Sequence, residues 1–215
     1  MNSTKLSYYL IFLMLVISLI SSFLVFDLVP NTIPSHWNAE GKVDGYSPKE
    51  LGLFLMPIIT ILVIITIIII PKIDPKKKNI KKFRFYFDVF VVTLTGFLLY
   101  LHFLTIFYAL ELIKNMILML LPAFAFLFFV IGIMVEKAKQ NYTIGIRTPW
   151  TLANEKVWEK THEKTGKWIK IASIITLIGI FFQGLEIFFI LTPIIIVFII
   201  STIYSYYLFS KIKNK

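Results

Sequence analysis

Residues 51–70 read LGLFLMPIITILVIITIIII, a run of twenty residues without a charged side chain. An α-helix rises about 1.5 Å per residue, so this run is roughly 30 Å long and matches the hydrocarbon core of a bilayer. Pro57 falls in its first turns, where a missing N–H costs least, and Pro71 and Pro75 are predicted to end it. The stretch therefore predicts a membrane-spanning helix.

Further apolar runs lie on both sides of this stretch, separated by short polar segments. They cover residues 8–26, 85–110, 116–135, 168–182 and 187–209. Joining the last two would give a span of about 40 residues, roughly 60 Å, which is twice the hydrocarbon thickness. The hydrophobic fraction of 58% also exceeds what one soluble core of 215 residues accommodates. We predict an all-α fold, a polytopic integral membrane protein with six transmembrane helices.

Lysine and arginine are distributed unevenly among the polar segments. Residues 1–7, 71–84, 136–170 and 210–215 hold 19 of them, whereas the remaining segments hold three. The positive-inside rule then predicts that both termini are cytoplasmic. Because this placement explains the net charge of +10, we expect membrane lipid as a partner and no direct nucleic-acid partner. The predicted location is a bacterial or archaeal cell membrane, crossed several times.

These boundaries divide the chain into three parts. Residues 1–70 hold the first two transmembrane helices and an extracytoplasmic loop at 27–50. Residues 71–135 hold a basic cytoplasmic loop and helices three and four. Residues 136–215 hold a cytoplasmic loop at 136–166 and helices five and six. The chain has no cysteine, which excludes disulfides, thiolate metal sites and cysteine nucleophiles.

The outer loop contains the sequence PNTIPSHWNAEGKVDG at residues 30–45. Its prolines and glycines favour a compact fold over a flexible linker. Acidic residues outnumber lysines in it by four to two, so a cationic peptide would suit it. The candidate surface residues are Pro34, His36, Asn38, Gly41 and Asp44. The alternative is that the histidine and the neighbouring tryptophan cap helix ends at the membrane interface.

A metal site in this loop would need converging ligands. His36 has Glu40 and Asp44 nearby but no second histidine. We therefore predict no metal, no catalytic residues and no cofactor. A membrane-bound metal-dependent peptidase that uses this histidine is the least favoured hypothesis.

The inner loop contains the sequence NYTIGIRTPWTLANEKVWEKTH at residues 141–162, here called the signature segment. Thr151 or Asn154 is predicted to cap a short helix that Gly166 ends. Its glutamates and lysines leave one less charged side, which predicts a helix lying at the membrane surface. Arg147 offers a planar set of donors, either for a partner carboxylate or for the carbonyls at the end of a neighbouring transmembrane helix.

Two ionisable residues, Asp88 and His102, lie within the third apolar run. Charges inside a bilayer are costly and often functional. Asp88 follows Arg84 by four residues, so a local ion pair explains it. His102 lies near the same helix face, and a proton path between the two would indicate a small proton-coupled transporter or channel.

The signature segment, followed by Gly166, resembles the signature of the SdpI family, bacterial immunity proteins against the sporulation-delaying-protein toxin. Residues 30–45 resemble a small domain of unknown function that often precedes that signature. The resemblance implies a membrane protein, not an enzyme, that gives resistance to a secreted cationic or hydrophobic peptide toxin. It also implies that the toxin-engaged protein holds a small DNA-binding repressor at the membrane.

The same resemblance implies two functional surfaces. The outer one consists of the candidate residues named above. The implied cytoplasmic signature surface consists of Asn141, Gly145, Arg147, Thr148, Pro149, Trp150, Thr151, Trp158 and His162.

Overall fold

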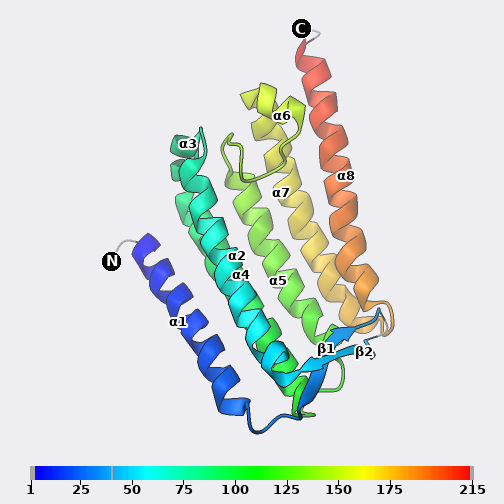
Figure 1. The fold of residues 1–215 in the computed structure, drawn as a ribbon. Coiled ribbons are helices and arrows are strands. Elements are labelled where there is room, and N and C mark those ends of the chain that lie inside the picture. The colour runs from blue at the N-terminus through cyan, green and yellow to red at the C-terminus, as the bar shows by residue number, and fades with distance from the viewer. Residues whose placement is uncertain (1–2, 40, 214–215) are drawn as a thin grey trace.

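The computed structural model describes residues 3–39 and 41–213, most of them in long helices (Figure 1). The long helices are α1 (Ser3–Val25), α2 (Lys49–Ile73), α4 (Arg84–Ala109), α5 (Met116–Lys137), α7 (Glu155–Ile178) and α8 (Glu186–Lys213). The short ones are α3 (Lys77–Lys82), α6 (Pro149–Ala153) and the 3-10 turn η1 (Gly179–Phe181). Within the described residues, five helices are long and apolar enough to span a bilayer, namely α1, α2, α4, α5 and α8. This composition is typical of a polytopic membrane protein.

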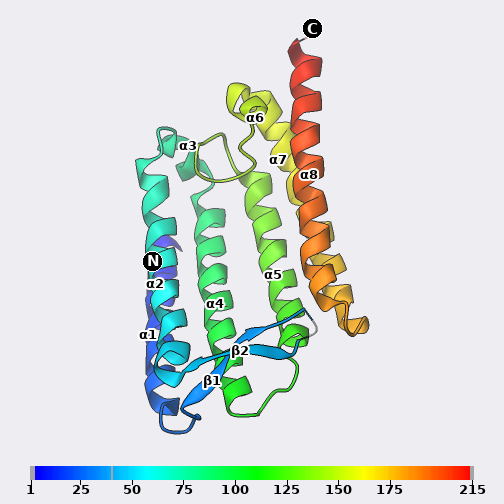
Figure 2. The same ribbon diagram turned by 45° about the vertical axis from the view of Figure 1, so that its right-hand side comes forward.

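The helices form two groups of three that share one bundle. Helices α1, α2 and α4 pack together, as do α5, α7 and α8, and contacts between α4 and α5 join the groups. Figure 2 shows α3 and α6 at one end, called the α6 end, and a β-hairpin at the other, called the hairpin end. The described ends of the chain, at the start of α1 and the end of α8, both lie toward the α6 end (Figure 1).

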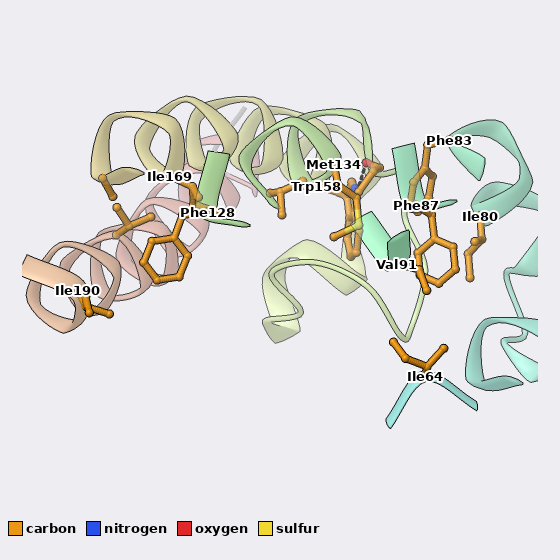
Figure 3. Close-up of a cluster of buried hydrophobic side chains, with 14 of the residues drawn as sticks. Ile64, Ile80, Phe83, Phe87, Val91, Phe128, Met134, Trp158, Ile169 and Ile190 are labelled. Atoms are coloured by element: carbon orange, nitrogen blue, oxygen red, sulfur yellow. Dashed lines mark hydrogen bonds between the residues drawn. The ribbon is translucent and has the colours of Figure 1, made fainter. Parts of the chain in front are cut away.

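A continuous cluster of buried apolar side chains joins the two groups (Figure 3). It runs from Ile64 of α2 through Phe87 of α4 and Met134 of α5 to Trp158 of α7 and Ile190 of α8. In Figure 3, Trp158 lies beside Met134 near the middle of this cluster. The outward faces of the helices carry many exposed large apolar side chains, which suits contact with lipid.

The hairpin corrects the all-α prediction. Strands β1 (Thr32–Trp37) and β2 (Val43–Pro48) pair antiparallel and form a two-stranded sheet. Ile33 anchors the hairpin, because its side chain is fully buried against the cluster that contains Leu53 and Ile106. Pro34 is tolerated in β1, since both strands of a two-stranded sheet are edge strands. The prediction that the loop at 27–50 has a compact fold is confirmed.

Helix α7 corrects a second prediction. Gly166 does not end a surface helix, and α7 continues through it to Ile178. A Cβ atom at Gly166 would lie 2.6 Å from the carbonyl oxygen of Gly132, so the glycines allow α5 and α7 to approach closely. The less charged side of α7, which includes Val157 and Thr161, is fully buried inside the protein and does not face a membrane surface.

Two further boundaries differ from the prediction. The run predicted at 168–182 forms the second half of α7 and η1, and α7 is not among the five apolar spans. The count of six spans therefore stays a prediction. Helix α2 passes Pro71 and ends at Ile73, because an apolar helix packed against neighbours tolerates the lost hydrogen bond.

Candidate functional site

The signature segment begins with a turn built around one side chain. Asn141 is fully buried, and its Oδ1 accepts hydrogen bonds from the backbone N–H groups of Thr143 (2.8 Å) and Ile144 (2.6 Å). Its Nδ2 donates to the carbonyl oxygens of Lys139 (2.8 Å) and Ile144 (3.0 Å). A single amide thus satisfies the backbone of a turn that has no helix or sheet to pair with.

His162 fixes the next part of the loop from the side of α7. The backbone N–H of Ile146 donates to His162 Nε2 at 2.9 Å, and His162 Nδ1 donates to the Trp158 carbonyl oxygen at 2.8 Å. The Trp158 and His162 rings stack with centroids 3.9 Å apart, and Trp158 Nε1 donates to the Ala138 carbonyl oxygen. Gly145 has a φ of +114°, which favours glycine, and its backbone lies against this histidine.

Burial lowers the pKa of His162 from 6.5 to about 4, against the opposing effect of its bond to the Trp158 carbonyl. The neutral ring is also what the geometry requires, since Nε2 must accept from Ile146. A positive charge at this position would remove that acceptor and leave the loop amide without a partner.

Residues 138–154, between α5 and α7, are here called the signature loop. Acidification from pH 6.5 to pH 4 should therefore loosen this loop. Above pH 6.5 the histidine is neutral in both the closed and the open loop, and its full stabilisation is present. As the pH falls, the open loop binds a proton that the closed loop does not, until the loss reaches about 3 kcal/mol near pH 4. Hydrogen exchange of the Ile146 amide, corrected for its intrinsic pH dependence, would report this change.

The matched control is His162→Gln, whose side-chain oxygen accepts a hydrogen bond without titrating. It should show little change in Ile146 exchange over the same pH range. An equal pH dependence in both proteins would mean that another group controls the loop.

Helix α6 attaches the loop to α8. Thr148 caps α6, because its Oγ1 accepts a hydrogen bond from the backbone N–H of Thr151. The Thr151 hydroxyl in return accepts a hydrogen bond from the backbone N–H of Thr148. Pro149 occupies the first turn, where its missing N–H is not needed. The Thr148 hydroxyl also lies 3.0 Å from that of Ser205 in α8. These bonds fix the orientation of α6 against the bundle.

A second attachment joins the loop to α2 and α3, and the sequence analysis missed it. The buried Gln140 side chain donates to two carbonyl oxygens of α6 and accepts from Lys76 Nζ. Asp74, also buried, accepts from the backbone N–H of Lys76 at 2.6 Å and of Tyr142 at 2.9 Å. Asp74 is the one acidic residue among the basic residues of the segment 72–84, and this was the feature of the sequence that could have indicated the attachment.

Part of the predicted signature surface is therefore interior. The buried members are Asn141, Thr148, Thr151, Trp158 and His162. Each uses its polar atoms to make hydrogen bonds with the loop backbone or with a neighbouring helix. These residues therefore support the loop from inside and are not themselves available to a partner. Polar residue types alone do not distinguish the two roles.

The outward-facing part of the loop includes Arg147, Pro149 and Trp150. Arg147 is exposed, and its Nη1 donates to the Tyr142 carbonyl oxygen at 2.7 Å. That carbonyl belongs to the same loop. The prediction that Arg147 caps the carbonyls of a neighbouring transmembrane helix is therefore wrong. Pro149 is exposed, and Trp150 is half-buried against the ring of Tyr206 in α8.

The hairpin presents most of the second group of candidate residues. His36 and Asp44 are exposed, and a hydrogen bond joins His36 Nδ1 to Asp44 Oδ1 across the two strands. Asn38 Oδ1 accepts from the backbone N–H of Lys42, and Gly41 takes a φ of +78° in the turn between the strands. Among the described residues, no group of three or more His, Cys, Asp or Glu side chains is placed to hold a metal ion.

The two ionisable residues of α4 have separate partners. Asp88 accepts from Arg84 Nε at 2.6 Å and from the Thr4 hydroxyl at 2.7 Å, so the predicted local ion pair is confirmed. His102 is buried with Nε2 3.2 Å from the hydroxyls of two α1 serines. No hydrogen bond within the described part of the chain joins the two residues.

Comparison with known proteins finds a match for each of the two segments. Residues 137–205 match the model of the SdpI/YfhL protein family, and residues 13–61 match a domain of unknown function, DUF1648. A curated relative, "Immunity protein SdpI" of Bacillus subtilis (strain 168), is 24% identical over 199 residues, which cover 92% of this chain and 93% of the relative. No solved structure matches. The chain is therefore similar to the SdpI/YfhL family over the signature segment, α7 and most of α8, and to the DUF1648 domain over residues 13–61 in its N-terminal half.

Proposed function

We propose that this chain is a membrane immunity protein, without enzymatic activity, that protects a bacterial or archaeal cell from a secreted cationic or hydrophobic peptide toxin. The observation that supports this most strongly is the alignment along nearly the whole chain with a relative named for immunity. The two segments that match family models also contain the hairpin and the signature loop, which lie at opposite ends of the bundle.

The proposed topology has six spans, with α7 as the fifth crossing and both termini in the cytoplasm. Two observations support it. The described ends of α1 and α8 lie toward the same end of the bundle (Figure 1), and that end also carries the basic residues of α3. By the positive-inside rule, the α6 end would face the cytoplasm and the hairpin end would face outward.

The signature loop would carry out the cytoplasmic part of the function, which is to bind a partner protein. Its rigid interior supports an exposed surface that includes Arg147 and Pro149, with Trp150 beside them. An exposed guanidinium and a half-buried aromatic ring on the same loop are suited to a protein partner. We propose that this surface holds a small DNA-binding repressor when toxin is bound outside.

Survival of toxin-sensitive bacteria tests the proposal. Cells that express the native chain should survive exposure to a sporulation-delaying-type toxin, and Arg147→Ala, matched for membrane level, should lose protection. The arginine is exposed and makes one loop hydrogen bond, so its replacement should cost about 1 kcal/mol of stability or less.

Lys164→Ala is the matched control, because Lys164 is an exposed cation on α7 outside the loop. Protection that survives in this control and fails in Arg147→Ala would locate function in the loop. Full membrane insertion of the native chain without any protection would contradict the immunity proposal.

A further inference from the structure

The β-hairpin covers a groove at the hairpin end of the bundle. Two adjoining cavities, of about 500 Å³ and about 350 Å³, lie beneath it. Their shared walls come from β1 and from the first turns of α5: Ser35, Trp37, Met116 and Leu120. The larger cavity extends to Leu55 of α2 and the smaller to Ile187 of α8. Cavities of this size hold ligands, and we call the pair the hairpin groove.

Two polar atoms at this groove lack partners. Trp37 Nε1 and Ser47 Oγ are buried and make no hydrogen bond within the described part of the chain, and both residues line the larger cavity. A buried donor without an acceptor is unfavourable, so each such atom requires an explanation. A ligand that brings hydrogen-bond acceptors into an otherwise apolar groove would satisfy both.

The separation of these two residues along the hairpin indicates what kind of ligand fits. Ser47 pairs with Ile33, and Trp37 lies four residues farther along β1, roughly 13 Å in an extended strand. A peptide in extended conformation presents carbonyl groups along its whole length and reaches both positions with about four residues. The ester carbonyls of a phospholipid lie together at one end of its chains, so a single lipid would not reach both.

The charge at this end favours a cationic ligand. Among the described residues, the exposed acidic ones of the hairpin end are Asp27, Asp44, Glu50 and Glu111. The exposed lysines there are Lys42 and Lys114, while Lys49 is half-buried and donates to the Phe26 carbonyl oxygen. The four carboxylates outnumber the three lysines by one, so the surface around the groove is slightly acidic, in contrast to the basic α6 end, and favours positively charged chains.

We propose that the hairpin groove binds an extended, apolar segment of about four residues from a cationic peptide. The Trp37 N–H and the Ser47 hydroxyl donate to two of its backbone carbonyls. The proposal rests on the immunity function above and names the place where the toxin docks.

Binding to the full-length chain in phosphatidylcholine nanodiscs tests this site, with a fluorescent sporulation-delaying peptide toxin as the probe. Ser35→Phe places a ring in the wall shared by both cavities and should raise the dissociation constant at least tenfold, about the effect of one lost anchor. Thr32→Phe is the matched control, since Thr32 is an exposed hydroxyl residue of β1 outside the groove, and it should bind within about twofold of the native chain. Hydrogen exchange of the Lys42 amide, which is bonded to Asn38, would verify that the hairpin stays folded in both variants.

The outcomes separate this proposal from the immunity proposal. Native-like binding by Ser35→Phe, in a chain that protects cells, would overturn the groove and leave immunity standing. Absence of both binding and protection in the native chain would overturn both. Brominated phosphatidylcholine quenches the emission of tryptophans that lie close to lipid. The quenching that comes from Trp37 is the difference between the native chain and Trp37→Phe, and toxin should relieve this part. Quenching that toxin does not relieve would identify the occupant as lipid and overturn the peptide site.

Discussion

Replacing Gly145 by alanine should open the signature loop and abolish protection. At the φ of +114° an L-residue is strained, which costs about 1–3 kcal/mol. The added Cβ atom would also lie 2.3 Å from His162 Nε2, a contact that no small adjustment relieves because the ring is stacked on Trp158. Together these effects should destabilise the closed loop by about 3 kcal/mol or more.

Hydrogen exchange of the Ile146 amide measures this directly, since its acceptor is the displaced nitrogen. A loss of about 3 kcal/mol corresponds to exchange that is faster by roughly a hundredfold. Gly184→Ala is the control: Gly184 also has positive φ, +83°, but an added Cβ atom would meet no atom within 4 Å. It carries the backbone strain without the contact and should leave Ile146 exchange as in the native chain. Unchanged exchange in Gly145→Ala would show that the histidine does not hold the loop.

The sequence predicts the five apolar helices well, because the hydrophobic effect alone determines them. Residues 85–110 and 116–135 were expected to span, and the helices cover Arg84–Ala109 and Met116–Lys137. Errors at the ends are a few residues long. A run of apolar side chains needs no information from the rest of the chain to become a helix in a bilayer.

The meaning of single residues was harder to predict, because it depends on distant partners. Gly166 has the sequence context of a helix end, and only the position of Gly132 in another helix shows that it serves close packing. His162 was assigned to the signature surface from the family resemblance, yet its partner is a backbone amide sixteen residues earlier. Its spacing of four residues from Trp158 was a usable signal, since that spacing puts the two rings on one helix face.

The hairpin was missed for a related reason. Pro34 and Pro48 argue against strands in a large sheet, and the segment is too short to show a clear alternation. What stabilises the pairing is the burial of Ile33 beneath the bundle, at the start of α2 and the end of α4. That contact exists only after the helices have assembled, so a local pattern does not contain it.

Replacing Gly166 by leucine should separate α5 from α7 and destabilise the bundle. Even a Cβ atom would lie 2.6 Å from the Gly132 carbonyl oxygen and 2.9 Å from the Glu136 backbone nitrogen, and backbone atoms cannot move aside as a flexible side chain can. The helices must move apart, which would loosen the buried face of α7 and the Lys170–Glu136 ion pair of 2.6 Å. We expect a loss of about 2–4 kcal/mol.

The free energy of unfolding in bicelles would measure this loss, with Gly96→Ala as the control. Gly96 lies in α4, where an added Cβ atom would lie 3.8 Å from the Met14 methyl group, an ordinary contact. That substitution should be neutral or stabilise by up to about 1 kcal/mol, because alanine favours the helix. A similar effect at both positions would mean that helix propensity, and not close approach, explains Gly166.

A double-mutant cycle sharpens the test. Gly132→Ala and Gly166→Ala each force the same pair of helices apart, since each Cβ atom would contact the carbonyl oxygen of the other glycine. Once one substitution has moved the helices, the second meets less resistance, so the double mutant should lose less stability than the sum of the single losses. Additive losses would show that the two glycines act at independent contacts. The cycle therefore decides whether α7, half charged and half apolar, owes its place in the bundle to this one close approach.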